Sequence, residues 1–240
     1  MVASIKWTIE ARERIHNLNL SVAEHQEYYN VILEDFIWQN ESFWDDIRGE
    51  RRYKSYDGKI DIRKVHQDIY GYRTVGVGFN MDDVAARKEW SDAFGGTISF
   101  NDVRGGIRIL SDEEVLKLFR QNIKSRREQL IKHFTEKVWE ELKPNERLAI
   151  EDLYFNGGPR LATKCGGIET NFSQCIKRYG AYGEKKDLEA AVKEVRYRSN
   201  SKKQYGLQQR REVEAIMLAS YESAVYSMPG NMAIPKKSKA

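Results

Sequence analysis

Apolar residues recur at intervals of three and four positions between residues 22 and 38, the spacing that places them on one face of a helix. They are Val22, Tyr29, Ile32, Leu33, Phe36 and Ile37. Ser21, directly before them, is one of the residue types favoured at a helix N-cap. We therefore predict a long amphipathic helix that begins after Ser21.

The pattern changes between residues 51 and 79, where β-branched and aromatic residues are frequent in RRYKSYDGK and YRTVGVGF. Asp57-Gly58 and Gly71 interrupt these runs, and both are typical of tight turns between strands. The segment predicts a small antiparallel sheet.

Helical spacing returns after residue 80. Ser111 and Glu114 have the spacing of a capping box, ahead of a helix that we expect to extend to about residue 132. Pro144 opens a further helix, which the run Asn156-Gly157-Gly158-Pro159 ends.

Two more helices are expected, the first capped by Asp187 and the last lined by Val213, Ile216, Met217, Ser220 and Ala224. This order predicts an α+β fold in which a sheet forms one lobe and helices form the other, with the substrate site in a cleft between the lobes. We divide the chain into an N-terminal extension at residues 1–20, one domain at residues 21–226 and a flexible basic tail at residues 227–240.

The composition is that of a folded protein, with 40% apolar, 32% charged and 11% aromatic residues. The net charge of +4 is compatible with a weak attraction to anionic surfaces, but it is too small to indicate a nucleic-acid partner. The basic clusters at residues 124–127 and 210–211 have acidic neighbours. A nucleic-acid-binding helical protein is therefore the least favoured alternative, and we expect no nucleic-acid partner.

Cysteine and histidine positions give no metal-binding or redox motif. We expect Cys165 and Cys175 to be free, buried thiols. We also expect no metal and no cofactor, because these cysteines form no spaced cluster with the histidines His16, His25, His66 and His133. The first 17 residues lack the apolar stretch of a secretory signal, and no apolar run is long enough to cross a bilayer. We expect no stable membrane insertion.

The most specific signal is the segment from Asp68 to Thr74 with the VGVGFNM that follows it. Five residues separate Asp68 from Thr74, and Gly76 and Gly78 alternate with valines, which lets the strand pass close to a substrate or to the opposite lobe. The segment resembles the motif of phage-type lysozymes, glycoside hydrolase family 24, which includes the lysozymes of T-even phages. The pieces SDEEVLKLF, LYFNGG, TNF, LEAAVKEV and QQRREVE follow in the family's order, so the resemblance spans roughly residues 30 to 220.

The resemblance implies a mainly helical, two-lobed lysozyme-like fold and a muramidase that hydrolyses the β-1,4 bond between N-acetylmuramic acid and N-acetylglucosamine in peptidoglycan. Such hydrolysis needs an acid that protonates the leaving oxygen and a carboxylate that activates water or attacks the sugar. By resemblance, Asp68 activates the water with the help of Thr74, in a single displacement with inversion. Judged singly, Asp68 is also an ordinary turn residue and Thr74 is ordinary strand content.

The general acid of this family is a glutamate at the end of the first helix, separated from the aspartate by eight residues, but residue 59 is a lysine. An insertion must therefore precede Asp68, which leaves two candidates, Glu41 and Glu50. Helical phase favours Glu41, because Phe36 and Ile37 lie five and four residues before it. Glu50 requires the shorter insertion and stays open as the alternative.

Asp57 also competes for the water-activating role, but it lacks the spacing to Thr74 and ranks behind Asp68. Asn156 matches a family segment on the substrate cleft, which implies hydrogen bonds to sugar groups; alternatively, it ends its helix in a left-handed conformation. Arg210 and Arg211 match a basic segment of the family's last helices, where we expect packing or pairing with acids. Aromatic side chains near the sheet could stack on sugars, although core packing explains most aromatic residues.

The altered acid spacing also motivates a second class of function, a non-catalytic peptidoglycan-binding or structural virion protein with a lysozyme-like fold. For the enzyme, two roles stay open: a lysis enzyme released by a holin or similar membrane-permeabilising partner, and a virion-associated enzyme that opens the wall during infection. In both roles we expect a monomer, made in the host cytoplasm without a signal peptide, that acts on the periplasmic wall.

Overall fold

The computed structural model describes residues 15–45, 50–55, 57–68, 70–197 and 205–219. Helices make up most of this part of the chain, and its paired strands are antiparallel, so the predicted α+β class is confirmed. In chain order the elements are α2 (Ala23–Glu41), β1 (Ser42–Asp45), β2 (Glu50–Ser55), β3 (His66–Gln67), β4 (Arg73–Val75), β5 (Phe79–Asn80), α3 (Ala86–Phe94), α4 (Phe100–Arg104), α5 (Asp112–Phe134), α6 (Glu136–Glu141), α7 (Pro144–Gly157), α8 (Pro159–Ala162), β6 (Lys164–Cys165), β7 (Ile168–Glu169), α9 (Asn171–Tyr182), α10 (Lys185–Tyr197) and α11 (Tyr205–Leu218).

Two small sheets occupy the region where the sequence predicts strands. β1 pairs with β2, and β3, β4 and β5 form a three-stranded sheet in which Thr74 lies between His66 and Asn80. A bridge between Lys54 and Asp61 links β2 to the segment that leads to β3. The segment between Glu41 and Asp68, where the resemblance implies an insertion, contains the β1–β2 hairpin.

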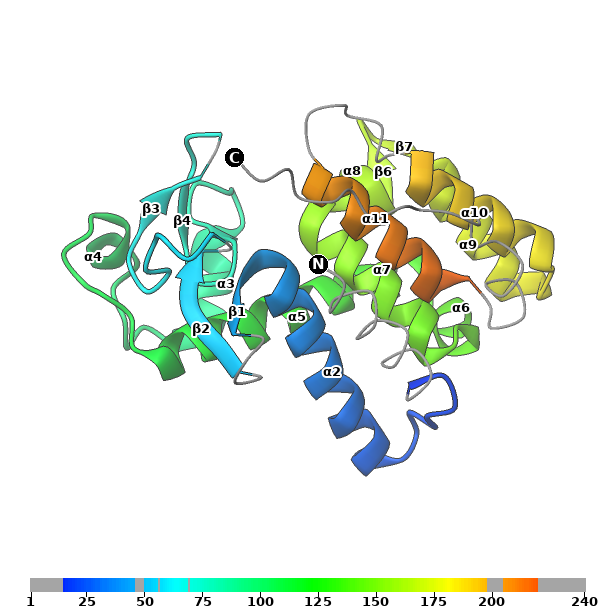
Figure 1. Ribbon diagram of the computed structural model, residues 1–240, viewed down its shortest axis with the longest axis horizontal. Coiled ribbons are helices and arrows are strands. Elements are labelled where there is room, and N and C mark those ends of the chain that lie inside the picture. Colours follow the sequence, from blue (N-terminus) through cyan, green and yellow to red (C-terminus); the bar gives the residue numbers. More distant parts are fainter. Residues whose placement is uncertain (1–14, 46–49, 56, 69, 198–204, 220–240) are drawn as a thin grey trace, which may run out of the picture.

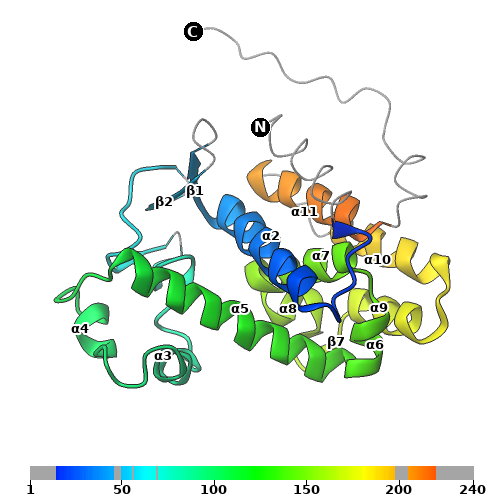
Figure 2. The same cartoon turned by 90° about the horizontal axis from the view of Figure 1, so that it is seen from below.

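The elements are segregated along the molecule. Figure 1 shows β3, β4, α3 and α4 at one end, which we call the sheet end, and α6 to α11 at the other, which we call the helical end. The long helix α5 runs from one end to the other in both Figure 1 and Figure 2. Within the described residues, no helix is both long and apolar enough to span a membrane.

Helix α2 follows the predicted pattern, and Tyr29, Ile32, Leu33, Phe36, Ile37 and Trp38 are its buried residues. The predicted N-cap is wrong by one residue, because Val22 occupies that position without a side-chain hydrogen bond. Ser21 instead donates its hydroxyl to Asn19 Oδ1 at 2.7 Å. The helix continues to Glu41, where the chain passes directly into β1.

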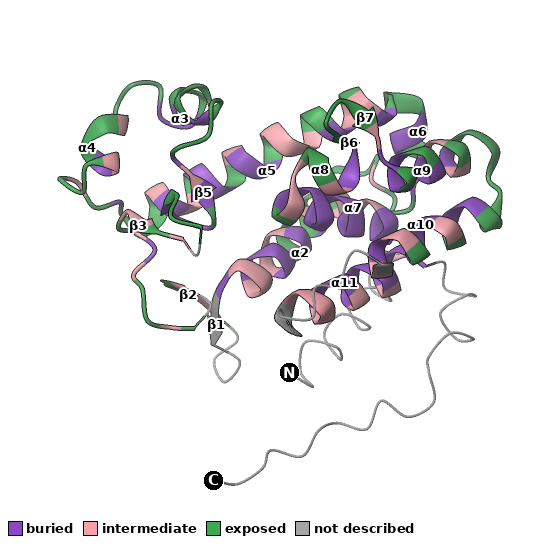
Figure 3. Cartoon of the chain, turned by 90° about the horizontal axis from the view of Figure 1, so that it is seen from above, coloured by how far each residue is buried: buried purple, intermediate pink, exposed green. Residues whose placement is uncertain are grey.

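Helices α5 and α7 confirm two predicted boundaries. Ser111 and Glu114 form the capping box at the start of α5. Pro144 is the first residue of α7, and Gly158 follows its end with a φ of 60°, a conformation that glycine adopts readily. α7 is buried over nearly its whole length and forms the centre of the helical end (Figure 3).

The later part of the chain differs from expectation in two places. Asp187 lies inside the first turn of α10 rather than capping it, and its Oδ1 accepts a hydrogen bond from Arg178 Nε at 2.7 Å. The short hairpin β6–β7 is not predicted by the sequence pattern, because each strand has only two residues. Ser220, Ala224 and the predicted tail lie outside the described residues.

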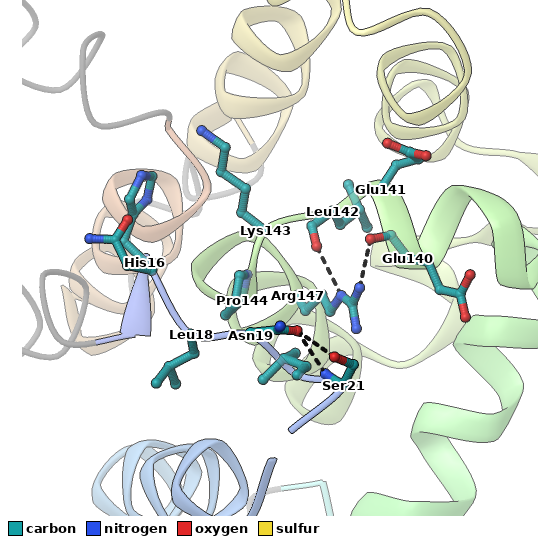
Figure 4. Close-up of a pocket in the computed structure, with 12 residues that line it drawn as sticks. His16, Leu18, Asn19, Ser21, Glu140, Glu141, Leu142, Lys143, Pro144 and Arg147 are labelled. Carbon is teal, nitrogen blue, oxygen red and sulfur yellow. Dashed lines mark hydrogen bonds between the residues drawn. The ribbon is translucent and has the colours of Figure 1, made fainter. Parts of the chain in front are cut away.

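The described part of the N-terminal extension packs on the helical end. Ile15 is fully buried, and His16 Nδ1 lies 3.2 Å from Asn145 Oδ1 at the start of α7. An open pocket of about 810 Å³ separates residues 16–21 from residues 140–147. Figure 4 shows Arg147 in this pocket, where it donates to the backbone carbonyls of Leu142 and Glu140 and so ties the α6–α7 connection to α7.

Helix α9 approaches α6 so closely at Gly180 that a side chain would collide with it. A Cβ atom at Gly180 would lie 2.7 Å from Val138 Cγ1 and 3.1 Å from the Val138 carbonyl oxygen. Overpacking of this kind costs about 1 to 3 kcal/mol, whereas alanine gains at most about 1 kcal/mol of helix propensity over glycine. We therefore expect Gly180→Ala to lower the free energy of unfolding, measured by urea denaturation.

Val138→Ala provides the matched background for this substitution, because it removes the Cγ1 atom. In that background, Gly180→Ala should cost less than it does in the original chain. An equal cost in both backgrounds would contradict the proposed collision.

Candidate active site

Glu41 lies at the point where α2 ends, and residues from distant parts of the chain hold its carboxylate. Arg210 Nη1, from α11, donates to Glu41 Oε1 at 2.5 Å, and Asn156 Nδ2, from α7, donates to the same oxygen at 3.4 Å. The Glu41 side chain keeps 19% of its surface exposed. Two helices of the helical end thus fix one carboxylate oxygen, while the side chain stays within reach of solvent.

Arg210 belongs to a buried ionic network. It forms a bidentate pair with Asp152, with Nε to Oδ2 at 3.0 Å and Nη2 to Oδ1 at 2.7 Å, and Glu214 Oε1 lies 3.6 Å from its Nε. Arg211 donates to Glu214 Oε2 at 2.6 Å. Three carboxyl groups, those of Glu41, Asp152 and Glu214, therefore share two guanidinium groups.

Burial and the neighbouring charges shift the pKa values of Glu214 and Arg210 in this network. Burial raises the pKa of Glu214 well above its ordinary value, with attraction by Arg211 opposing the shift. Burial opposes the charge of Arg210, but the negative charges of Asp152 and Glu41 outweigh it and raise the pKa of Arg210. Arg210 is therefore a permanent cation that holds Glu41 in place.

Asn156 connects Glu41 to the second arginine. Its amide nitrogen donates to Glu41, and its amide oxygen accepts a hydrogen bond from Arg211, so both ends of the amide group are oriented. The alternative of a left-handed, helix-ending asparagine is wrong: Asn156 lies within α7, and Thr135 is the one residue other than glycine with positive φ among the described residues. The side chain is instead part of the network around Glu41.

The β4–β5 turn brings the sheet end against Glu41. Gly78 has a φ of 69°, and a Cβ atom there would lie 3.7 Å from Glu41 Oε2 and 4.0 Å from Phe155 Cε1. These are ordinary van der Waals distances, so Gly78 lies near the Glu41 carboxylate, but the space there would also admit a Cβ atom. Gly78 follows Thr74 by four residues, so the Glu41 carboxylate lies near the β4–β5 turn that follows the segment from Asp68 to Thr74.

Asp68 organises the turn between β3 and β4. Its Oδ1 accepts the backbone N–H groups of Tyr70 at 2.8 Å and Tyr72 at 2.9 Å, and no described residue donates to its Oδ2. Thr74 is nearly buried, and its hydroxyl lies 3.4 Å from the Tyr72 carbonyl oxygen. Asp68 is therefore a turn residue that retains one carboxylate oxygen for other contacts.

The two competing acids lie elsewhere. Glu50 is the first residue of β2 and pairs with Asp45 of β1 across the hairpin. Its Oε1 forms an ion pair with Arg52 Nη2 at 2.6 Å. Asp57 lies in the exposed turn after β2, where hydrogen bonds from the Ser55 hydroxyl and the Lys59 N–H lower its pKa to about 2. Neither carboxylate makes a contact with Arg210 or Asn156 within the described residues.

Sequence reasoning missed three charged residues of the site, Asp152, Glu214 and Arg126. Arg126, from α5, donates to the carbonyl oxygens of Tyr154 at 3.2 Å and Phe155 at 2.6 Å, which fixes the end of α7 directly before Asn156. Asp152 could have been found, because it follows Leu148 by four residues and so shares the apolar face of its helix. A buried acid on such a face requires a cationic partner.

The described residues include no group of three or more histidine, cysteine, aspartate or glutamate side chains arranged to hold a metal ion. Cys165 is exposed and Cys175 is buried, both as free thiols, so the expectation of buried thiols is correct for Cys175 only.

Neither a scan against protein-family models nor a search of curated proteins gives a match to this chain.

Proposed function

We propose that this chain is a muramidase that cleaves the β-1,4 bond between N-acetylmuramic acid and N-acetylglucosamine of bacterial peptidoglycan. The observation that carries the proposal is the position of Glu41, which Arg210 and Asn156 hold near the β4–β5 turn, shortly after Asp68 and Thr74 in the chain. In this proposal the sheet end and the helical end are the two lobes of a lysozyme-like fold joined by α5. The glycan strand lies between them.

Glu41 is the proposed general acid. Arg210 and Asn156 occupy its Oε1, whereas its Oε2 faces Gly78 and receives no hydrogen bond from the described residues. Oε2 is therefore the oxygen that would carry the proton to the leaving glycosidic oxygen. This arrangement supports Glu41 over Glu50, whose carboxylate pairs with Arg52 on the inserted hairpin.

Asp68 is the proposed base. Two backbone N–H groups orient its Oδ1, which leaves Oδ2 to bind and activate a water molecule for attack on the anomeric carbon. By the same resemblance, the Thr74 hydroxyl would help to orient this water. Attack from the face opposite the leaving group inverts the configuration of the sugar.

Asp68→Asn tests the base. We expect the rate of reducing-end release from purified peptidoglycan to fall about a hundredfold or more, because the amide keeps an acceptor oxygen for the turn but cannot take a proton. Clearing of permeabilised Gram-negative cells should fall in parallel.

Asp57→Asn is the matched control, because Asp57 also accepts hydrogen bonds in an exposed turn. It should retain activity close to that of the original chain. Loss of activity in Asp57→Asn with activity retained in Asp68→Asn would contradict the assignment of the base. If the original chain bound peptidoglycan but released no reducing ends, the non-catalytic alternative would replace the enzyme.

A further inference from the structure

Two tyrosines project from the turn that Asp68 organises. Tyr70 is 72% exposed and Tyr72 is 50% exposed, although both lie next to a carboxylate that we assign to catalysis. The other large aromatic side chains of the sheet end are less exposed: Phe79, Trp90 and Phe94 belong to the core, and Phe100 packs against it. Core packing therefore does not account for Tyr70 and Tyr72.

The backbone of both tyrosines is fixed to the Asp68 carboxylate. The N–H groups of Tyr70 and Tyr72 donate to the same oxygen, Asp68 Oδ1, and Gly71 between them adopts a φ of 85°. The Asp68 N–H also donates to the Tyr72 carbonyl oxygen at 2.9 Å, which closes the turn. Each ring is thus attached to a backbone whose position relative to Asp68 is set by hydrogen bonds.

We propose that Tyr70 and Tyr72 form a stacking platform for the pyranose rings of the glycan strand beside the attacked anomeric carbon. This inference rests on the proposed muramidase function and adds the residues that bind the sugar. A β-1,4-linked pyranose carries its substituents mainly around the ring edge, so its two faces present C–H groups. The electron-rich face of a tyrosine ring attracts such groups, while its hydroxyl can bond to water or to a sugar hydroxyl.

The geometry predicts a kinetic signature. Removing a ring leaves the backbone N–H groups in place, so Asp68 keeps its orientation and the chemical step should proceed as before. Contacts that bind substrate and transition state equally lower KM without changing kcat. Loss of the platform should therefore raise KM and leave kcat nearly unchanged.

The experiment uses the double variant Tyr70→Ala/Tyr72→Ala and the control Tyr182→Ala. Tyr182, at the end of α9 on the helical end, is 75% exposed, so the control removes an equally exposed ring far from Asp68. Reducing-end release is measured against the concentration of soluble glycan strands, and binding is measured by sedimentation with insoluble peptidoglycan. We expect the double variant to raise KM about tenfold, equivalent to about 1.4 kcal/mol, while Tyr182→Ala matches the original chain.

An unchanged KM in the double variant, with an active original chain, would overturn the platform and leave the muramidase assignment intact. A fall in kcat with KM unchanged would also overturn it, because the tyrosines would then act on Asp68 rather than on the sugar. If the original chain sediments with peptidoglycan but releases no reducing ends, loss of sedimentation in the double variant supports the platform although hydrolysis fails. An original chain that neither sediments nor cleaves overturns both proposals.

Discussion

Replacing Glu41 by glutamine is expected to lower kcat for peptidoglycan hydrolysis about a hundred- to ten-thousandfold. Glutamine has nearly the same shape, and its amide oxygen can still accept hydrogen bonds from Arg210 and Asn156. It cannot supply an acidic proton to the leaving oxygen. The loss should therefore appear in kcat, measured as reducing-end release at saturating substrate, with binding to insoluble peptidoglycan preserved.

Glu50→Gln is the control for this prediction. Glu50 pairs with Arg52 on the β1–β2 hairpin and is about half exposed, so its replacement should leave activity near that of the original chain. The reverse result, full activity in Glu41→Gln and loss in Glu50→Gln, would move the acid to the hairpin and contradict the assignment made here.

Arg210→Met is expected to lower the free energy of unfolding by about 3 to 5 kcal/mol, the usual cost of leaving a buried charge without its partner. Asp152 is fully buried, and it would lose both hydrogen bonds of its bidentate pair. Glu41 would lose its ion pair with α11 at the same time. Urea denaturation at neutral pH gives the measurement.

The deficit, meaning the loss in free energy of unfolding caused by Arg210→Met, should become smaller as the pH falls. Burial raises the pKa of Glu214 already in the original chain, and removing a cation favours protonation of the neighbouring carboxyls further. Protonation removes the unpaired charge, so the deficit should be largest at neutral pH and shrink as the pH falls.

Lys88→Met is the control, because it removes an exposed ion pair with Asp92. It should leave the urea midpoint nearly unchanged. A similarly small effect for Arg210→Met would show that the buried network does not stabilise the fold.

The parts of the structure that the sequence predicts are those with local signals. The capping box of Ser111 and Glu114 and the stop at Gly158 depend on residues within one or two turns of helix, and both are observed as predicted. The two-residue strands β6 and β7 are too short to produce a pattern. The N-cap prediction at Ser21 failed because a nearby acceptor, Asn19, binds its hydroxyl.

In the candidate site, too, the residues with a local sequence signal could be predicted and their distant partners could not. Asp68 and Thr74 could be singled out from a contiguous motif, and helical phase favoured Glu41. The partners of Glu41 could not be assigned, because Arg210 lies 169 positions away and Asn156 lies 115 positions away along the chain. Their approach depends on how α2, α7 and α11 pack, and no local pattern records that packing.

The reliance of Glu41 on α11 also has a consequence for synthesis of the protein. A ribosome produces Glu41, Asp68 and Thr74 in the first third of the chain, but Arg210 comes near the end. A nascent chain therefore carries both proposed catalytic carboxyls long before it has the guanidinium that positions one of them. Assembly of the site is deferred until translation of the last described helix, so incomplete translation products would lack an ordered acid.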